Sequence, residues 1–244
     1  MSDSTAIRPS STLILVRDAS DAPEVLLVRR HSKTVFGGAH VFPGGIVEPV
    51  DDEIDAGSLS AVDADKRLGE TNARRFYSAA IRELFEETGI LLSEEPPDPT
   101  LKKALLRGGV HWPVLLDQAN IHLAFDHLRY ISQWITPPVM AKRYATRFFL
   151  AAFDNRHTAV PCGGEVTECR WLSAAEALAA GERGDIVLHP PTRLTLEQLA
   201  RQPSVSALLD WASDVERRGA PTIAAANTNL RSIREALFDE VAVS

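Results

Sequence analysis

Short apolar runs bounded by turn-forming residues predict a strand-rich first part of the chain. Thr12–Arg17 and Val25–Arg30 contain mainly aliphatic and β-branched residues, and the sequence Asp-Ala-Ser-Asp-Ala-Pro between them is typical of a turn. We therefore expect these two runs to form a pair of neighbouring strands, followed by a glycine-rich stretch at 36–45. Similar runs predict three further strands, at Tyr130–Ile135, Arg147–Phe153 and Glu168–Leu172.

A helical pattern begins near Thr71, with Thr71 or Asn72 as its cap, and stops at Gly89. Before it, residues 48–70 are acidic and rich in turn formers, which favours an irregular insertion. Shorter helices are expected at Thr100–Arg107, at Trp112–His122, from a cap at Ser173 to about Ala180, at Leu194–Ala200 and at Val205–Arg217. Strands mixed with few helices, without an internal repeat, predict a layered α/β (α+β mixed) or α/β/α domain rather than a regular βαβ alternation.

The long helix carries three carboxylates on one face. At about 100° per residue, Glu83, Glu86 and Glu87 fall within an arc of roughly 100°. Such close carboxylates repel one another, and a hard cation such as Mg²⁺ would turn the repulsion into ligation. Arg82, at the edge of this face, could orient one carboxylate. A solvated acidic face on a surface helix is the alternative, but the Pro-Gly-Gly loop at 43–45 lets backbone approach a ligand closely and favours a site. The opposite arc, which we expect in the core, holds Ile81, Leu84, Phe85 and Thr88.

Charge and composition exclude several classes of protein. The formal charge of −7 and the pI near 5.5 argue against broad binding to nucleic acid or to a membrane surface, although a local basic patch stays open. Cys162 and Cys169 are too few for a disulfide framework or a cysteine-rich zinc site. A hairpin could bring them together, but two reduced thiols are the favoured interpretation. The chain shows no signal peptide and no apolar run long enough for a membrane span, so we expect a soluble, cytoplasmic protein.

Gly45 together with Arg82–Ile90 resembles the Nudix box, whose second half this sequence matches at every defined position. The resemblance implies a Nudix-type α/β/α sandwich and Mg²⁺- or Mn²⁺-dependent hydrolysis of a nucleoside diphosphate linked to another moiety. It makes Glu83, Glu86 and Glu87 metal ligands, Arg82 their salt-bridge partner, and a backbone carbonyl of Gly44 or Gly45 a further ligand. We assign Gly45 to the metal and Gly44 to the substrate. We expect Glu83 or Glu86 to take the proton of the attacking water, with Arg82 completing the catalytic set.

The first half of the box departs from the family pattern. Six residues after Gly45 stands Asp51 instead of glutamate, and 30 residues rather than seven separate it from Arg82. The box is therefore split by an insertion at about 52–76. The acidic residue that replaces the loop glutamate is Asp51, Asp52 or Glu70.

Flanking segments narrow the resemblance to a subgroup over about residues 12–200. Residues 26–31 and 38–45 are similar to the segment ahead of the box in coenzyme A diphosphatases, and later segments at 134–137, 142–149, 165–172 and 190–192 resemble the peroxisomal Nudix hydrolase that cleaves coenzyme A esters. This implies coenzyme A or acyl-coenzyme A as substrate, cleaved to 3′,5′-ADP and a phosphopantetheine. Arg29, Arg30 and Arg143 are candidate phosphate contacts, of which we assign Arg30 and Arg143; a surface salt bridge is the alternative for each. The alternatives are ADP-ribose, NADH or a dinucleotide polyphosphate as substrate, or a non-catalytic Nudix-fold binding protein.

The remaining assignments concern the loops and the ends of the chain. Glu165 is a further candidate base or ligand, with an ordinary turn residue as the alternative. We expect residues 1–11 to be a flexible N-terminus, 12–200 to form the Nudix domain, and 201–244 to be a helical extension. That extension would serve as a cap or as the contact in a homodimer. The expected partner is a small nucleotide, with no nucleic acid and no membrane.

Overall fold

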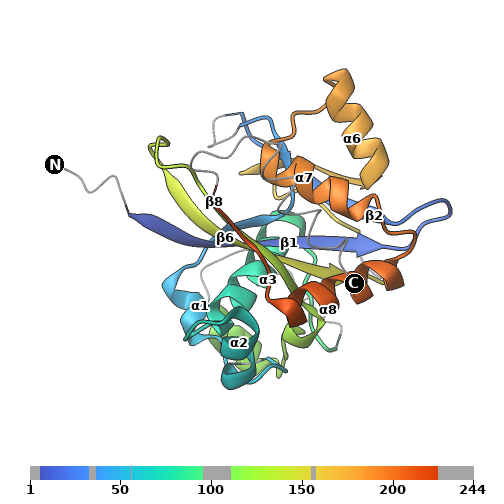
Figure 1. Ribbon diagram of the computed structural model, residues 1–244. Coiled ribbons are helices and arrows are strands. Elements are labelled where there is room, and N and C mark those ends of the chain that lie inside the picture. Colours follow the sequence, from blue (N-terminus) through green and yellow to red (C-terminus); the bar gives the residue numbers. More distant parts are fainter. Residues whose placement is uncertain (1–5, 33–36, 56, 96–110, 155–157, 225–244) are drawn as a thin grey trace.

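The computed structural model describes residues 6–32, 37–55, 57–95, 111–154 and 158–224. Within them the strands form one eight-stranded mixed sheet, in which β3, β2, β1, β6, β5 and β8 follow one another, β4 pairs with β1, and β7 pairs with β2 (Figure 1). The strands are β1 (Ile7–Arg17), β2 (Glu24–Arg30), β3 (His40–Val41), β4 (Gly44–Ile46), β5 (Arg129–Ile135), β6 (Arg143–Ala152), β7 (Val166–Ser173) and β8 (Thr222–Ala224).

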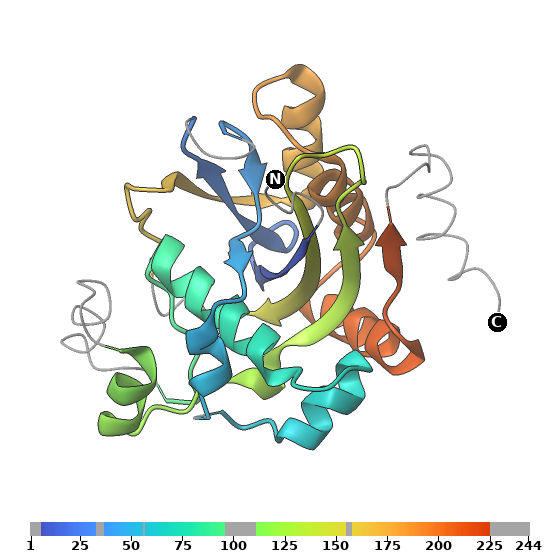
Figure 2. The same cartoon turned by 90° about the vertical axis from the view of Figure 1, so that its left-hand side faces the viewer.

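Helices cover both faces of this sheet (Figure 2). One face is covered by α1 (Pro49–Glu53), α2 (Ala61–Leu68), α3 (Arg74–Thr88) and α5 (Trp112–Gln118), and the other by α6 (Ala174–Arg183), α7 (Pro190–Leu199) and α8 (Val205–Arg218); a short 3₁₀ helix, η1 (Phe125–His127), precedes β5. Side chains of β1 alternate between the two cores, because Leu13 and Leu15 pack with α3 while Ile14 and Val16 pack with α6 to α8. The predicted α/β/α sandwich is confirmed.

One edge of β1 pairs with two strands, β2 and β4, and the pairing with β4 sets the position of Gly44 and Gly45. Its last residues pair with β2, whereas Ser10–Thr12 pair with Gly44–Ile46 of β4. The other edge pairs in parallel with β6 over ten residues, from Ile7 to Val16. β1 therefore begins at Ile7, before the predicted start at Thr12, because Arg8, Pro9 and two serines hide the apolar alternation that marks a strand.

The predicted irregular stretch at 48–70 was wrong in part, since it contains α1 and α2. Local capping explains both helices: Pro49 starts α1 beside a capping box of Glu48 and Asp51, and the Ser60 hydroxyl accepts a hydrogen bond from the Asp63 amide at the start of α2. The long helix begins at Arg74, three residues after Thr71, because Asn72 adopts φ +58° and cannot continue a helix.

The other predicted elements are largely confirmed. Helix α6 begins after its cap Ser173, whose side chain and that of Glu176 form a capping box. Helix α5 ends at Gln118, short of His122, since Asn120 turns the chain at φ +51°. The expected helix at Thr100–Arg107 lies outside the described residues.

The structure tests two further expectations, one about the C-terminal extension and one about the two cysteines. The described part of the C-terminal extension is not only helical, because β8 pairs in parallel with β5; three residues are too short to show a strand pattern, and tertiary contact alone places them. Cys162 and Cys169 are free thiols, as predicted. None of the helices in the described ranges has the length and apolarity that crossing a membrane requires.

Candidate functional site

A cavity of about 760 Å³ lies where β1, β4, α3, the β5–β6 hairpin and the start of α7 meet. One end holds Glu83, Glu86 and Glu87, which α3 presents together, and Gly44 and Gly45 border them on β4. The remaining wall is mainly apolar and includes Val41, Phe42, Trp134, Ile135, Pro137, Met140, Phe148, Pro190 and Pro191. A carboxylate cluster thus faces a chamber suited to an organic group.

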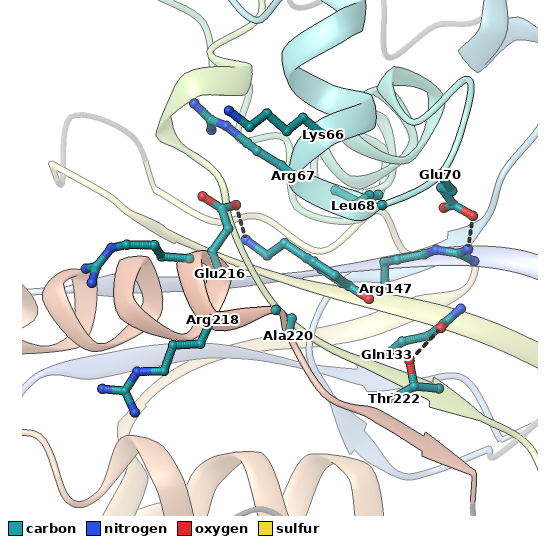
Figure 3. A pocket seen from close by; sticks show the side chains of 14 residues that line it. Lys66, Arg67, Leu68, Glu70, Gln133, Arg147, Glu216, Arg218, Ala220 and Thr222 are labelled. Atoms are coloured by element: carbon teal, nitrogen blue, oxygen red, sulfur yellow. Dashed lines mark hydrogen bonds and ion pairs between the residues drawn. The ribbon is translucent and has the colours of Figure 1, made fainter. Parts of the chain in front are cut away.

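A second cavity, of about 510 Å³, shares no lining residue with the first. It lies between the ends of α2 and α8 and includes Arg147 and Glu70, which one of the dashed lines in Figure 3 joins. The Arg147 Nη2 donates to Glu70 Oε2 at 2.6 Å. None of the predicted metal ligands borders this cavity, so the first one is the candidate site.

The acidic face of α3 is only partly solvated. Glu87 is only 4% exposed, and the side chains of Glu83 and Glu86 are 13% and 44% exposed. Burial, aided by the charge of Glu83, raises the pKa of Glu87 to about 8. Burial also raises the pKa of Glu83 to about 7, against the lowering effect of Arg82. Without a cation nearby, both carboxyl groups therefore hold a proton more tightly than usual. The opposite face of α3, which holds Ile81, Leu84, Phe85 and Thr88, is fully buried as predicted.

Arg82 ties this face to α1 through a buried ion pair. Its Nε and Nη2 donate to the two carboxylate oxygens of Asp51, both at 2.9 Å, and Nη2 also donates to the carbonyl of Ile46. Burial alone would lower the pKa of the guanidinium, but Asp51 and the charges of Glu83 and Glu86 raise it. Arg82 is therefore charged at every physiological pH.

Three acidic residues were candidates to replace the loop glutamate of the box, and the ion pair with Arg82 favours one of them, Asp51. Asp51 contacts Arg82, whereas Asp52 accepts a hydrogen bond from Asn72 at 2.7 Å and Glu70 binds Arg147. Asp51 is also the residue at the counted position of the box, six after Gly45. The α1 turn brings it back to α3 despite the insertion.

Arg82 also orients the acidic face itself. Its Nη1 donates to Glu83 Oε1 and to Glu86 Oε2, both at 3.0 Å. Across the described ranges, no three acidic, histidine or cysteine side chains are already arranged as a metal-binding cluster. The donor set nevertheless fits a hard divalent ion, because it offers several carboxylate oxygens beside backbone carbonyls in a partly enclosed space.

The two glycines differ in the direction of their peptide groups. The Gly44 amide donates to Glu87 Oε2 at 3.1 Å, so this residue faces α3. The Gly45 carbonyl instead accepts the Ser10 hydroxyl at 2.6 Å and faces β1. A Cβ atom at Gly45 would collide with the carboxyl group of Glu83, which would then have to move from its position beside Arg82.

The structure separates the two arginines expected to bind phosphate. Arg30 borders the cavity, and its Nη2 lies 3.6 Å from Glu165 Oε2, another lining residue whose side chain is 70% exposed. Arg143 is not a lining residue, and its Nε donates to the Thr136 carbonyl. Residues of β6 alternate between the two faces, and Tyr144, Thr146 and Phe148 take the cavity side, so Arg143 points to the other face.

Sequence reasoning missed the aromatic wall of the cavity. Trp134, Phe148 and Phe42 form a chain with ring centroids 6.3 and 6.4 Å apart. A β-bulge between Tyr130 and Ser132 turns Trp134 to this side of the sheet, opposite the core that contains Tyr130. No local pattern in the sequence predicts this bulge, because it arises from the pairing of β5 with β6.

Comparisons with known proteins agree with this geometry. A family model, the NUDT19 Nudix domain, matches residues 60–199, which is more than half of the chain. The Caenorhabditis elegans protein named "Putative nudix hydrolase 7" is 28% identical over 212 residues, covering 84% of this chain and 62% of that protein. Acyl-coenzyme A diphosphatase NUDT19 of Gallus gallus is 28% identical over 247 residues, covering 78% of this chain and 65% of the chicken protein.

A solved structure is similar over nearly its whole length. The NUDIX hydrolase from Alicyclobacillus acidocaldarius superposes with a TM-score of 0.71 at 27% identity, covering 84% of this chain and 96% of that one. The present chain spans 62% and 65% of the two curated relatives, less than two thirds of either.

Proposed function

The chain belongs to the Nudix hydrolase family, as a member with the NUDT19 Nudix domain, and on this basis we propose that it hydrolyses the pyrophosphate bond of a nucleoside diphosphate linked to another moiety. The observation that carries the proposal is the arrangement of Glu83, Glu86 and Glu87 in the lining of the cavity, where Arg82 orients Glu83 and Glu86 and glycine backbone lies beside them.

Different residues would bind the metal ion and the phosphate groups of the substrate. Glu83, Glu86 and Glu87 would hold Mg²⁺ or Mn²⁺, which when bound neutralises pyrophosphate charge and acidifies a water molecule. Of the two glycines, Gly44 is the better source of a carbonyl ligand, because neighbouring peptide groups of a strand point to opposite edges and Gly45 faces β1. Arg30 would contact a phosphate oxygen.

The bond changes are those of a simple hydrolysis. The oxygen of water bonds to one phosphorus, the bridging P–O bond breaks, and the leaving phosphate departs with the electron pair. The proton of the water passes to Glu83 or Glu86, whose carboxylates Arg82 holds in place.

Two observations favour coenzyme A or acyl-coenzyme A as the substrate. The chicken relative is named an acyl-coenzyme A diphosphatase. The apolar wall around Trp134, Phe148 and Met140 offers a place for a pantetheine arm or an acyl chain. The products would be 3′,5′-ADP and a phosphopantetheine.

A substrate panel tests this proposal. Coenzyme A, an acyl-coenzyme A, ADP-ribose, NADH and a diadenosine polyphosphate are incubated with the protein and Mg²⁺ or Mn²⁺, and products are identified by mass spectrometry. We expect 3′,5′-ADP from the coenzyme A compounds. Cleavage of ADP-ribose or the dinucleotides alone would keep the pyrophosphatase and reject its coenzyme A substrate. Absence of any turnover by a protein that binds Mn²⁺ would support a non-catalytic Nudix fold.

The two arginines provide a matched pair for the phosphate contact. Arg30→Gln should lower kcat/KM by about 10- to 100-fold, because a charge-assisted hydrogen bond to phosphate is worth about 1.5–3 kcal/mol. Arg143→Gln removes the same charge outside the cavity and should stay within about twofold of wild type. Steady-state kinetics on the best substrate of the panel measure both. An equal loss in the two variants would place the phosphate elsewhere.

A further inference from the structure

Ser10 makes a short hydrogen bond to the glycine loop from inside the cavity. Its Oγ donates to the Gly45 carbonyl at 2.6 Å, and the residue is 6% exposed and borders the cavity. The bond joins β1 to β4 from a side chain, in addition to the backbone pairing of Ser10 with Ile46 and of Ser11 with Gly45. Neither the family pattern nor the acidic helix involves this serine.

A side-chain restraint matters here because β4 is only three residues long and two of them are glycines. Glycine has no Cβ, so the peptide groups around Gly44 and Gly45 can reorient more easily than those of other residues. The peptide group before Gly44 is fixed on both sides, because the Leu13 amide donates to Pro43 O and the Gly44 amide donates to Glu87. The carbonyl of Gly45 accepts the Ser10 hydroxyl, in addition to the backbone pairing of Gly45 with Ser11. The Gly44 carbonyl belongs to the peptide group between these two anchors.

We propose that Ser10 is a positioning residue that fixes the Gly44–Gly45 backbone, and so directs the Gly44 carbonyl to the divalent ion. The inference rests on the proposed function, because it assumes that the acidic end of the cavity holds such an ion. Outer groups that orient metal ligands typically contribute 10- to 100-fold to metal affinity. Removal of the Ser10 hydroxyl should therefore weaken metal binding without unfolding the protein.

The neighbouring serine supplies the control. Ser11 is fully buried on the opposite side of β1, does not border the cavity, and its hydroxyl has no hydrogen-bond partner within the described part of the chain. Ser10→Ala and Ser11→Ala thus delete the same atom from adjacent residues of one strand. Only the first deletion removes a bond to the glycine loop. Ser10→Thr keeps the hydroxyl and tests for rescue.

Mn²⁺ binding to the full chain, followed by the electron paramagnetic resonance signal of the free ion, measures the effect. We expect Ser10→Ala to raise the Kd for Mn²⁺ by about tenfold, Ser10→Thr to recover most of the affinity, and Ser11→Ala to match wild type. Thermal unfolding in EDTA should give a similar Tm for Ser10→Ala and wild type, which separates positioning from a general loss of stability.

Three results would overturn the proposal. Equal Kd values for Ser10→Ala and Ser11→Ala would show that the hydroxyl does not act on the metal ligands. A higher KM with an unchanged Kd for Mn²⁺ would make Ser10 a substrate contact instead. If wild-type protein binds no Mn²⁺, the proposed function itself fails, and this inference fails with it.

Discussion

Replacing Glu87 with glutamine should lower kcat by roughly 10²- to 10³-fold while the protein stays folded. Glutamine has nearly the same shape, and its amide oxygen can still accept the Gly44 amide that now binds Glu87 Oε2. It cannot supply the negative charge that a divalent ion needs, at a position that is only 4% exposed. Steady-state kinetics with saturating Mg²⁺ on the best substrate measure the loss.

Glu182→Gln is the matched control for this substitution. Glu182 is an exposed residue of α6 outside the cavity lining, so the same chemical change there should leave kcat within about twofold of wild type. Wild-type turnover by Glu87→Gln would contradict the assignment of Glu87 to the metal.

Glu87→Gln should also alter the pH dependence of stability in the metal-free protein. Burial raises the pKa of Glu87 from 4.5 to about 8, so the folded state binds a proton more tightly than the unfolded chain does. Stability is therefore lost as the pH rises from about 4.5 to about 8. Glutamine does not titrate, and the Tm of Glu87→Gln in EDTA should fall less steeply over this range. Equal slopes would show that the Glu87 carboxylate is not held in a buried, proton-binding environment.

The sequence predicted the parts of the site that depend on local periodicity. A helix that carries Glu83, Glu86 and Glu87 on one face follows directly from 3.6 residues per turn, and the neighbouring glycines mark a close approach of backbone. The same local logic predicted the strand pair and the capped helix α6. These features need only a few consecutive residues to specify them.

Features set by pairing over long distances were not predictable. Counting from Gly45 reached Asp51, but the choice among Asp51, Asp52 and Glu70 required the fold of the insertion. The side of the sheet that Arg143 takes depends on where β6 begins. The aromatic wall of the cavity was not predicted for a similar reason. The bulge that turns Trp134 toward the cavity arises only from the pairing of β5 with β6.

Breaking the buried ion pair should give the largest loss of stability among the changes considered. Asp51→Asn leaves the Arg82 guanidinium, whose side chain is 3% exposed, without its only fully buried carboxylate partner among the described residues. We expect a destabilisation of about 3–5 kcal/mol, measured by urea unfolding, because removing one partner of a buried ion pair is costly even though Nη1 still binds Glu83 and Glu86. Asp52→Asn, which affects an exposed contact to Asn72, should cost less than about 1 kcal/mol. Similar losses in both variants would contradict the special role of Asp51.

A double replacement separates the contribution of the pair to stability from its contribution to the site. Apolar residues of similar size often replace a buried ion pair with little loss, so Asp51→Leu combined with Arg82→Met should recover much of the stability that Asp51→Asn loses. Activity should stay low even so, because Glu83 and Glu86 lose the Nη1 donor that holds both carboxylates at 3.0 Å. Recovery of both stability and turnover would mean that the carboxylates orient themselves without Arg82. Recovery of stability alone would show that the pair is kept for the geometry of the acidic face rather than for the stability of the fold.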